Sequence, residues 1–321
     1  MAGYKSIKFL LLALGLVVLV IFISTIDLKS LSLALKKFNI SILFIVSTLV
    51  VLNLIVKAIR WKFLVYKTSK RDITARFSFL SILAGVASGS LTPGRGEIAK
   101  PLMLKSYGIP LSEATAAAFI EKIFDMFALC LLFLISLIFF IDYKGITYII
   151  YFAIAIFIFF LLFIAHLKKV QHLFIILLKK IPVTGSKAIE FSNRFFESFA
   201  MLKKKRVLAL ISLLSVSSML LEIIRIFYIF TFFGLGVSFF LAMFSFSAAI
   251  VAGVISLVPG GIGINEISQT AIIAGLSKAD TGLLKNAVLI DRLFAYYLLI
   301  FFGALVLMKS GAKSKNPNSK L

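Results

Sequence analysis

SLTPGRGEIAK, residues 90–100, ends one apolar run of the chain with a proline and a glycine, and charged side chains follow at once. A second stretch, SLVPGGIGINE at residues 256–266, ends another apolar run in the same way. Proline removes a backbone N–H and glycine permits conformations that other residues avoid, so both patterns predict a broken helix. Broken backbone at membrane depth is tolerated only where protein or water surrounds it, so such breaks indicate an interior polar region.

Composition places these breaks in a membrane protein. Of the 321 residues, 61% are hydrophobic, 34 are Phe and only 15% are charged, and the mean hydropathy is +1.09. A soluble chain of this length cannot bury so much apolar surface. The net charge of +22 comes from basic residues that flank apolar runs, which fits anionic lipid and membrane topology rather than nucleic acid. One cysteine, Cys130, excludes an intramolecular disulfide or a Cys-based zinc site, and we expect no metal and no cofactor.

The apolar runs predict an all-α, polytopic helix bundle, because a helix needs about 20 apolar residues to cross a bilayer. Six runs are long enough to span: Phe9 to Ile26, Phe38 to Val56, about Ala114 to Ile141, Gly145 to Leu167, Val207 to Phe233 and Asn286 to Met308. Two others, Phe77 to Thr92 and Phe239 to Val258, run into the breaks and predict re-entrant hairpins. The alternative is eight full spans, with the two broken pieces as ordinary helices.

Basic residues orient these spans. Two loops are rich in lysine and arginine and are expected on the cytoplasmic side: the first holds Arg60, Lys62, Lys67, Lys70, Arg71 and Arg76, and the second covers residues 168–206. The second loop also predicts an amphipathic helix on the membrane surface. Both termini are then cytoplasmic, including the basic tail 309–321, and the expected location is the plasma membrane.

Three landmarks recur along the chain and predict an internal repeat. Ser256 follows Ser90 by 166 residues, Ile59-Arg60 returns as Ile224-Arg225, and residues 120–124, IEKIF, return as residues 290–294, IDRLF. We expect one transmembrane domain over residues 1–308, made of repeats 7–141 and 145–308. With six spans the repeats are inverted, and the two hairpins meet tip to tip near the membrane centre.

Acidic residues inside apolar runs predict a polar interior. Each such charge costs about 2.5 to 3.5 kcal/mol at the centre of a bilayer. Glu121 and Asp125 lie four residues apart on one helix face beside Lys122, and Glu222 lies three residues before Arg225. Either these are structural pairs that tie helices together, or they line a polar cavity with Asp291 and Arg292, which the repeat favours.

The first break carries groups that bind phosphate. Arg95 offers a planar fork of donors, Lys100 a compact positive charge, and Gly94 and Gly96 expose backbone N–H groups. The alternative is that both cations only set topology. The break residues expected to shape the two hairpins are Pro93, Gly94, Gly96, Pro259, Gly260, Gly261 and Gly263.

These motifs resemble a flippase-like membrane family that includes the transmembrane part of lysylphosphatidylglycerol synthases and many stand-alone homologues. The resemblance rests on PG-R-GE-x-x-K at residues 93–100, the acidic third span and PGGIGINE at residues 259–266, and covers about residues 7–308. It implies movement of a lipid headgroup across the bilayer, with Arg95, Glu97 and Lys100 in the first motif and Gly260, Gly263 and Glu266 in the second. We expect no aminoacyl-transferase domain and no synthase activity in this chain.

Together these patterns predict a transporter of an anionic lipid or a polyprenyl-phosphate-linked headgroup through a central polar groove. The residues expected to bind it are Arg95, Glu97, Lys100, Glu121, Lys122, Asp125, Glu222, Arg225, Glu266, Asp291 and Arg292. Alternatives are a membrane scaffold for a polyprenyl-dependent glycosyltransferase, or an ion or small-solute transporter. We do not expect an enzyme. The acidic metal-binding pair of glycosyltransferases, Asp-x-Asp, does not occur in the sequence. An intramembrane Ser-His hydrolase needs a histidine at depth, and both histidines, His166 and His172, lie at or beyond the end of the fourth span.

Overall fold

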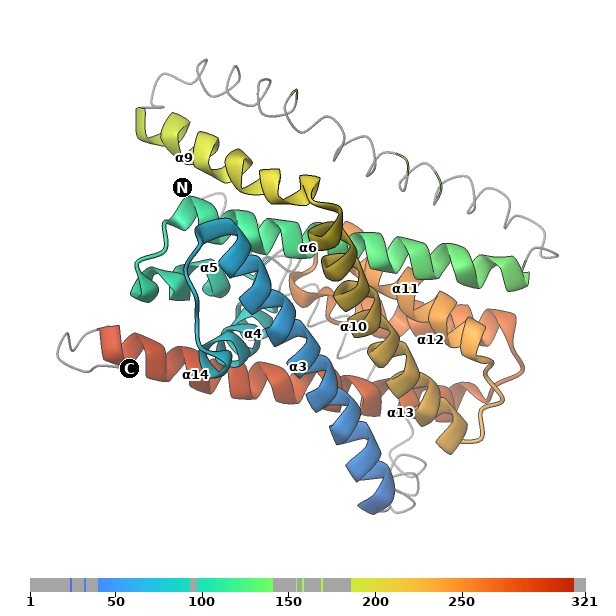
Figure 1. Cartoon of the computed structure of the whole chain (residues 1–321). Helices are drawn as coiled ribbons and strands as arrows, with labels where there is room; N and C mark the ends of the chain where they lie inside the picture. Colours follow the sequence, from blue (N-terminus) through green and yellow to red (C-terminus); the bar gives the residue numbers. More distant parts are fainter. Residues whose placement is uncertain are drawn as a thin grey trace. The chain divides into compact units, whose positions relative to one another are not determined.

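The computed structural model describes residues 40–92, 97–140 and 186–314, together with single positions 24, 32, 154, 158 and 169. Apart from these single positions, the predicted first and fourth spans lie outside the described residues, as does the first break, residues 93–96. The described residues form helices and no strand (Figure 1). The all-α prediction is therefore confirmed.

The longest helices correspond to predicted spans. Three of them have the length and composition to cross a membrane: α3 (Ile40–Ser69), α10 (Lys205–Phe232), and a continuous helical stretch from Thr281 to Lys309. A fourth long helix, α6 (Leu111–Leu137), matches the predicted acidic third span. Along α3, apolar side chains such as Phe44, Val51 and Ile59 are exposed, which suits contact with lipid.

The predicted C-terminal end of the second span needs a correction. The sequence placed Arg60, Lys62 and Lys67 in a loop after a span that ended at Val56, whereas α3 continues to Ser69. These residues belong to the last turns of the helix, because a helix can extend well beyond the 20 or so residues that the hydrocarbon core requires. Arg60 in particular is buried, with 1% of its surface exposed.

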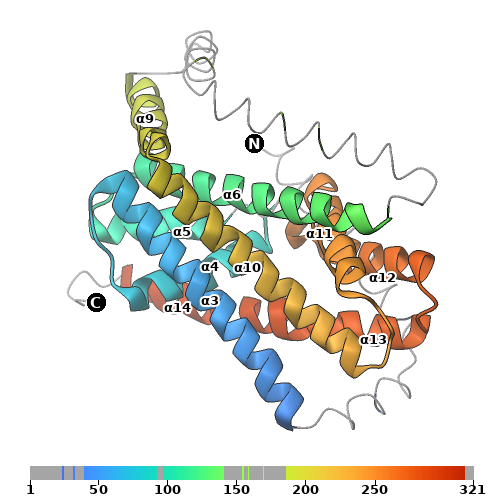
Figure 2. The same cartoon turned by 45° about the vertical axis from the view of Figure 1, so that its right-hand side comes forward.

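The second break separates two short helices, α11 (Phe239–Ile255) and α12 (Ile264–Leu276). They pack against each other, as Figures 1 and 2 show. Between them the backbone takes left-handed conformations at Leu257, Gly260, Gly261 and Gly263, and η5 (Pro259–Gly261) forms a single tight turn. With 13 residues, α12 is about 20 Å long, too short to cross about 30 Å of hydrocarbon, which favours the re-entrant hairpin.

The first broken segment is built similarly from α4 (Ala75–Gly89) and the short α5 (Ala99–Met103), which continues into η2 (Leu104–Tyr107). The hydroxyl of Ser88 accepts a hydrogen bond of 3.2 Å from the backbone N–H of Ala99. This bond holds the start of α5 against the end of α4, on either side of the first break.

The predicted last span, Asn286 to Met308, consists of three parts. Helix α13 (Thr281–Arg292) starts where Asp280 accepts a 2.7 Å bond from the Leu283 N–H, and α14 (Leu298–Ser314) completes the span. Between them lies a π-helical turn, η6 (Leu293–Tyr297). Such wide turns are rare and frequently occur at functional sites.

In the loop predicted to lie on the membrane surface, the described part forms α9 (Ser186–Glu197) and η4 (Ser198–Lys203), followed directly by α10. The rings of Phe195 and Phe199 are tilted against each other, and both make edge-on contacts with Phe119 of α6. The basic run from Lys203 to Arg206 is exposed. An aromatic face of α9 and η4 that packs against α6, together with exposed cations, fits the predicted amphipathic segment.

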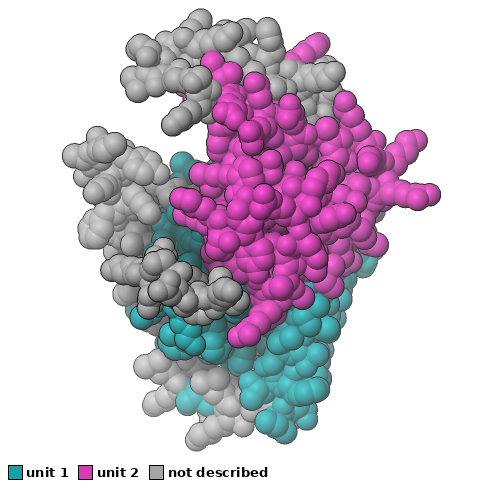
Figure 3. Space-filling model, turned by 60° about the vertical axis from the view of Figure 1, so that its left-hand side comes forward, with its two compact units in different colours: residues 1–55, 80–99, 220–321 teal, residues 56–79, 100–219 magenta. Residues whose placement is uncertain are grey.

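The chain divides into two compact units, coloured separately in Figure 3. Unit 1 comprises residues 1–55, 80–99 and 220–321, and unit 2 comprises residues 56–79 and 100–219. Helices α3 and α10 each contribute one part to each unit. This division follows contacts in space, so it does not coincide with the repeats, which were defined by sequence similarity and remain a prediction.

A close helix crossing within unit 1 gives a first test of the structure. A Cβ atom added to Gly303 of α14 would collide with the backbone oxygen of Leu83 on α4. We therefore expect Gly303→Ala to lower the free energy of unfolding by about 1–3 kcal/mol, because backbone must move to make room.

The measurement is the melting temperature in detergent, with Gly275→Ala on α12 as the matched control. A Cβ atom at Gly275 meets no atom within 4 Å in the described structure, so this substitution should leave the melting temperature unchanged or raise it slightly. Equal melting temperatures for both variants would contradict the close approach of α4 and α14.

Candidate functional site: buried charge clusters

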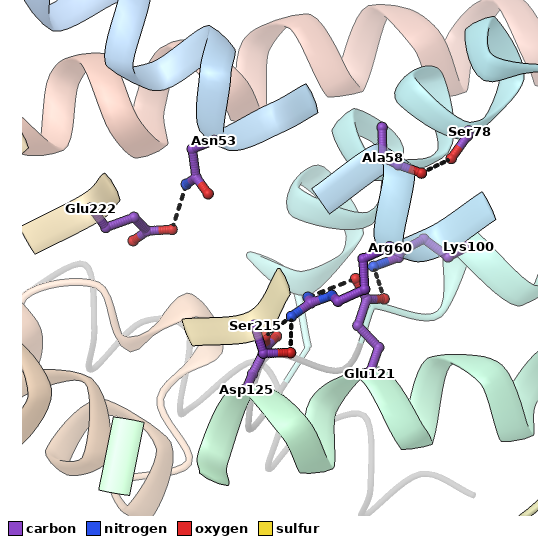
Figure 4. Close-up of polar contacts among 9 residues, drawn as sticks. All are labelled: Asn53, Ala58, Arg60, Ser78, Lys100, Glu121, Asp125, Ser215 and Glu222. Carbon is purple, nitrogen blue, oxygen red and sulfur yellow. Dashed lines mark hydrogen bonds and ion pairs between the residues drawn. The ribbon is translucent and has the colours of Figure 1, made fainter. Parts of the chain in front are cut away.

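The first cluster lies in unit 2 around Arg60 and is called the Arg60 cluster (Figure 4). The guanidinium group of Arg60, on α3, donates hydrogen bonds to Asp125 (2.6 Å) and Glu121 (2.9 Å) of α6. It also donates to the hydroxyl of Ser215 on α10 (2.7 Å). One arginine thus joins three helices, and both carboxylates of the predicted i, i+4 pair face it.

Lys100 completes the Arg60 cluster. Its ammonium group pairs with the second oxygen of Glu121, and it lies 4.8 Å from the centre of the Trp61 ring. Only 2% of Lys100 is exposed. Glu121 therefore bridges two cations, and an aromatic face adds a further favourable contact for the ammonium charge.

The Arg60 cluster is balanced in charge. Arg60 and Lys100 supply two positive charges, and Glu121 and Asp125 supply two negative ones. Charges at membrane depth are costly, and mutual pairing with additional hydrogen bonds offsets that cost. Among the described residues, no group of three or more His, Cys, Asp or Glu side chains is arranged to hold a metal ion.

Unit 1 contains the second cluster, the Arg225 pair. Arg225 of α10 donates two hydrogen bonds to Asp291 of α13, one from Nε (2.7 Å) and one from Nη2 (3.3 Å). Both residues are at most 2% exposed. The predicted neighbour of Arg225, Glu222, accepts a 2.9 Å bond from Asn53 of α3. The sequence suggested that Arg225 pairs with Glu222 within one helix. In the structure, Arg225 also binds a different helix, because two nitrogens of its guanidinium group bond the two carboxylate oxygens of Asp291.

The third cluster, also in unit 1, surrounds Glu266 at the start of α12 and is called the Glu266 cluster. One oxygen of Glu266 accepts a 2.7 Å bond from the backbone N–H of Gly263, which caps the helix. The other oxygen lies 3.4 Å from Nε of Arg292 and 3.4 Å from the hydroxyl of Tyr297. Arg292 ends α13 and Tyr297 ends the π-turn, so the wide turn lies directly at this cluster.

The clusters occupy matching positions of the predicted repeat. Arg60 corresponds to Arg225, and Glu121 corresponds to Asp291; in each unit the arginine binds the matching carboxylate. In the register that relates Ser90 to Ser256, Lys100 corresponds to Glu266. Lys100 binds Glu121, whereas Glu266 binds Arg292, so the same position carries opposite charges in the two halves. This agreement in contacts supports the repeat, although its inverted orientation stays a prediction.

The second break lies close to Ser90, at the end of α4, within unit 1. A Cβ atom at Gly260 would lie 3.2 Å from the Cα atom of Ser90 and would overlap the Tyr296 hydroxyl. Gly260 also has a φ of 67°, which side chains disfavour. Both reasons require glycine here. The end of α4 therefore lies beside the second break at Ser90 and Gly260, while the meeting of two hairpin tips near the membrane centre stays a prediction.

The predicted site residues are distributed unevenly over these clusters. Lys100, Glu121, Asp125, Arg225, Glu266, Asp291 and Arg292 are buried and take part in the contacts described above. Glu97 and Lys122 are half-buried. Arg95, Pro93, Gly94 and Gly96 lie outside the described residues, so their role in binding phosphate stays a prediction.

Sequence reasoning missed several members of the clusters. Arg60 was assigned to a loop, although its match to Arg225 in the repeat already marked it as a buried arginine. Ser215, Asn53 and Trp61 had no comparable signal, because isolated polar or aromatic residues in apolar runs are common. Tyr297 was missed because the π-turn that turns it toward Glu266 leaves no pattern in the sequence.

Comparison with known proteins identifies the family. The sequence model described as the lysylphosphatidylglycerol synthase TM region matches residues 8–303. The chain belongs to this family. A UPF0104 membrane protein of Methanothermobacter thermautotrophicus is 25% identical over 279 residues, which cover 78% of each chain. A UPF0104 membrane protein of Pyrococcus horikoshii is 22% identical over 331 aligned residues, which cover 94% of this chain and 97% of that one.

Membership in the lysylphosphatidylglycerol synthase TM region family confirms the resemblance seen in the sequence. The chain is a membrane protein of the flippase-like family, and the match includes both breaks and all three clusters. Burying charged side chains among apolar helices costs free energy, and this cost indicates that the buried charges serve a function.

Proposed function

We propose that this chain is a lipid flippase that moves an anionic headgroup, such as a lipid phosphate or a polyprenyl-phosphate-linked group, across the membrane. The observation that carries the proposal is the buried Arg60 cluster, whose arginine binds two carboxylates inside apolar helices. Buried charged groups in membrane proteins mark substrate or ion pathways. The matching Arg225 pair adds a second group of the same kind.

The possible exchange of a carboxylate for a phosphate at Arg60 supports an anionic substrate. A guanidinium fork binds carboxylate and phosphate oxygens with the same geometry. In this proposal Glu121 and Asp125 hold Arg60 when no substrate is present, and a headgroup phosphate displaces one of them during transport. Lys100 keeps its ion pair with the displaced Glu121, so that this carboxylate still has a cationic partner. The chain acts on the position of the lipid and breaks no covalent bond, which makes it a transporter rather than an enzyme.

A single substitution tests this proposal. Glu121→Gln removes one negative charge and keeps the shape, so Arg60 and Lys100 are left with an excess positive charge that traps the phosphate. We expect transport of a fluorescent anionic lipid in reconstituted vesicles to fall at least about tenfold, as expected for a 1.4 kcal/mol change in the barrier. The measurement is the rate at which label becomes accessible to a reductant outside the vesicles.

Asp72→Asn is the matched control, because Asp72 pairs with Lys62 at the surface, where 65% of its side chain is exposed. This variant should transport at the rate of the unaltered chain. Unchanged transport by Glu121→Gln, at equal incorporation into vesicles, would overturn the assignment of the Arg60 cluster. Absence of any lipid movement by the unaltered chain would favour a scaffold for a glycosyltransferase or a small-solute transporter.

We also propose that both termini lie in the cytoplasm of a plasma membrane. The exposed run Lys203–Arg206 directly before α10, together with Lys62 and Lys67 at the end of α3, supports this orientation. A single cysteine introduced at Lys204, in a chain whose Cys130 is replaced by alanine, should react with an impermeant thiol reagent only after the cells are opened. Labelling of intact cells would reverse the proposed orientation.

A further inference from the structure

Helix α12 has an inverted distribution of side chains. Its buried face consists of Asn265, Glu266, Gln269 and Thr270, followed by Ile273, whereas Ile267 on the other face is 40% exposed. A helix in a soluble protein normally buries its apolar face. In this membrane protein the polar face of α12 points into unit 1, so a row of polar groups is enclosed at the second break.

Four polar atoms on this face have no hydrogen-bond partner in the described structure: Oδ1 of Asn265, both amide atoms of Gln269 and the hydroxyl of Thr270. Nη2 of Arg292, on the neighbouring helix α13, also has none. Gln269 is completely buried, with 0% of its surface exposed. An unpartnered buried polar group costs about 1–3 kcal/mol, and native proteins keep few of them. Several within two turns of one helix, beside Arg292, indicate a binding site.

The mixture of groups defines the chemistry of the ligand. A phosphate accepts hydrogen bonds only, so the Asn265 oxygen and the Glu266 carboxylate would repel it. An ammonium group donates only, so Arg292 would repel it. A hydroxyl group both donates and accepts, and it can satisfy an amide, a threonine and an arginine together.

We propose that the polar face of α12 binds the hydroxyl groups of a lipid headgroup, such as a sugar or a glycerol. This proposal rests on the proposed function, because it assigns the substrate class of the same flippase. Within unit 1, the hydroxyl-bearing part of the headgroup is recognised by Asn265, Gln269 and Thr270. The chain would accordingly prefer a headgroup that carries hydroxyl groups over the bare phosphate.

Binding of paired lipids to the full chain in detergent tests this inference. The first pair is a polyprenyl phosphate with and without one attached glucose, and the second is phosphatidylglycerol and phosphatidic acid. Affinities follow from native mass spectrometry at several lipid concentrations. We expect the hydroxyl-bearing member of at least one pair to bind about tenfold more tightly, as expected for one to two neutral hydrogen bonds. A preference in the first pair identifies a sugar, and one in the second identifies a glycerol.

Gln269→Leu should reduce this preference to about one and leave the affinity for the bare phosphate lipid unchanged. Because it removes a buried group without a partner, it should also keep or raise the melting temperature without lipid. The control is Ser192→Ala on α9, which removes another buried, unpartnered hydroxyl and should keep the preference.

The outcomes separate this inference from the proposed function. Equal binding within both pairs would overturn the inference, since α12 would then hold only water, while the flippase proposal would stand. A preference that survives in Gln269→Leu would overturn the assignment to α12. Failure of all four lipids to bind would overturn both proposals.

Discussion

An Arg60→Met variant is expected to lose about 3–5 kcal/mol of unfolding free energy, because it leaves buried carboxylates without their main partner. In the native chain, Arg60 binds Asp125 and Glu121 at 2.6 and 2.9 Å, and it is 1% exposed. Methionine fills a similar volume, so the loss reports charge rather than packing. The measurement is titration with a denaturing detergent, followed by the far-ultraviolet circular dichroism of the helices.

Lys62→Met provides the control on the same helix. Lys62 lies 3.3 Å from Asp72, but 39% of its side chain is exposed, and such surface pairs contribute about 0–1 kcal/mol. A second test combines Arg60→Met with Asp125→Asn. Neutralising Asp125 should cost much less when Arg60 is already absent, because the two groups interact directly. Additive losses, or equal losses for Arg60→Met and Lys62→Met, would contradict the buried cluster.

The positions of helices and breaks could be predicted from the sequence because they depend on local properties. Apolar runs of sufficient length specify α6 and α10, and Pro259 with its following glycines specifies the end of the α11 segment. The third break in regularity, the π-turn at Leu293–Tyr297, could not be predicted. It opens a stretch that carries no charged residue from Leu293 to Met308, so nothing within that stretch marks it, and only contacts with other helices determine where such a turn forms.

The carboxylates of the candidate site could be predicted, but most of their partners could not. Glu121 and Asp125 were evident, since an acid within an apolar run has few explanations. Arg60 was assigned wrongly, because an arginine near the end of an apolar run looks the same whether it faces lipid headgroups or a buried acid. The repeat distinguished these cases through Arg225. The charge reversal between Lys100 and Glu266 was also readable from the 166-residue register, yet its meaning required the contacts.

The Arg225 pair gives the second large expected effect, in which a double variant is more stable than either single one. Arg225→Met alone, or Asp291→Leu alone, should cost about 3–5 kcal/mol of unfolding free energy, because each leaves the opposite charge buried. The double variant should recover most of this loss and equal the unaltered chain to within about 1 kcal/mol, since apolar residues suit the helix interior. Arg225 donates two hydrogen bonds to Asp291, so these two side chains can be removed together, and the nearby Glu222 keeps its bond to Asn53.

Transport by the same double variant decides between the two roles that the sequence left open for buried pairs. If Arg225 and Asp291 only join α10 to α13, the stable double variant should move lipid at the normal rate. If they contact the headgroup, transport should fall at least about tenfold although the fold is intact, as expected when binding to the transition state is lost. We expect the second result, because a purely apolar pair would have joined these helices without the cost of two buried charges. Normal transport by a stable double variant would assign the Arg225 pair a structural role and leave the Arg60 cluster as the candidate site.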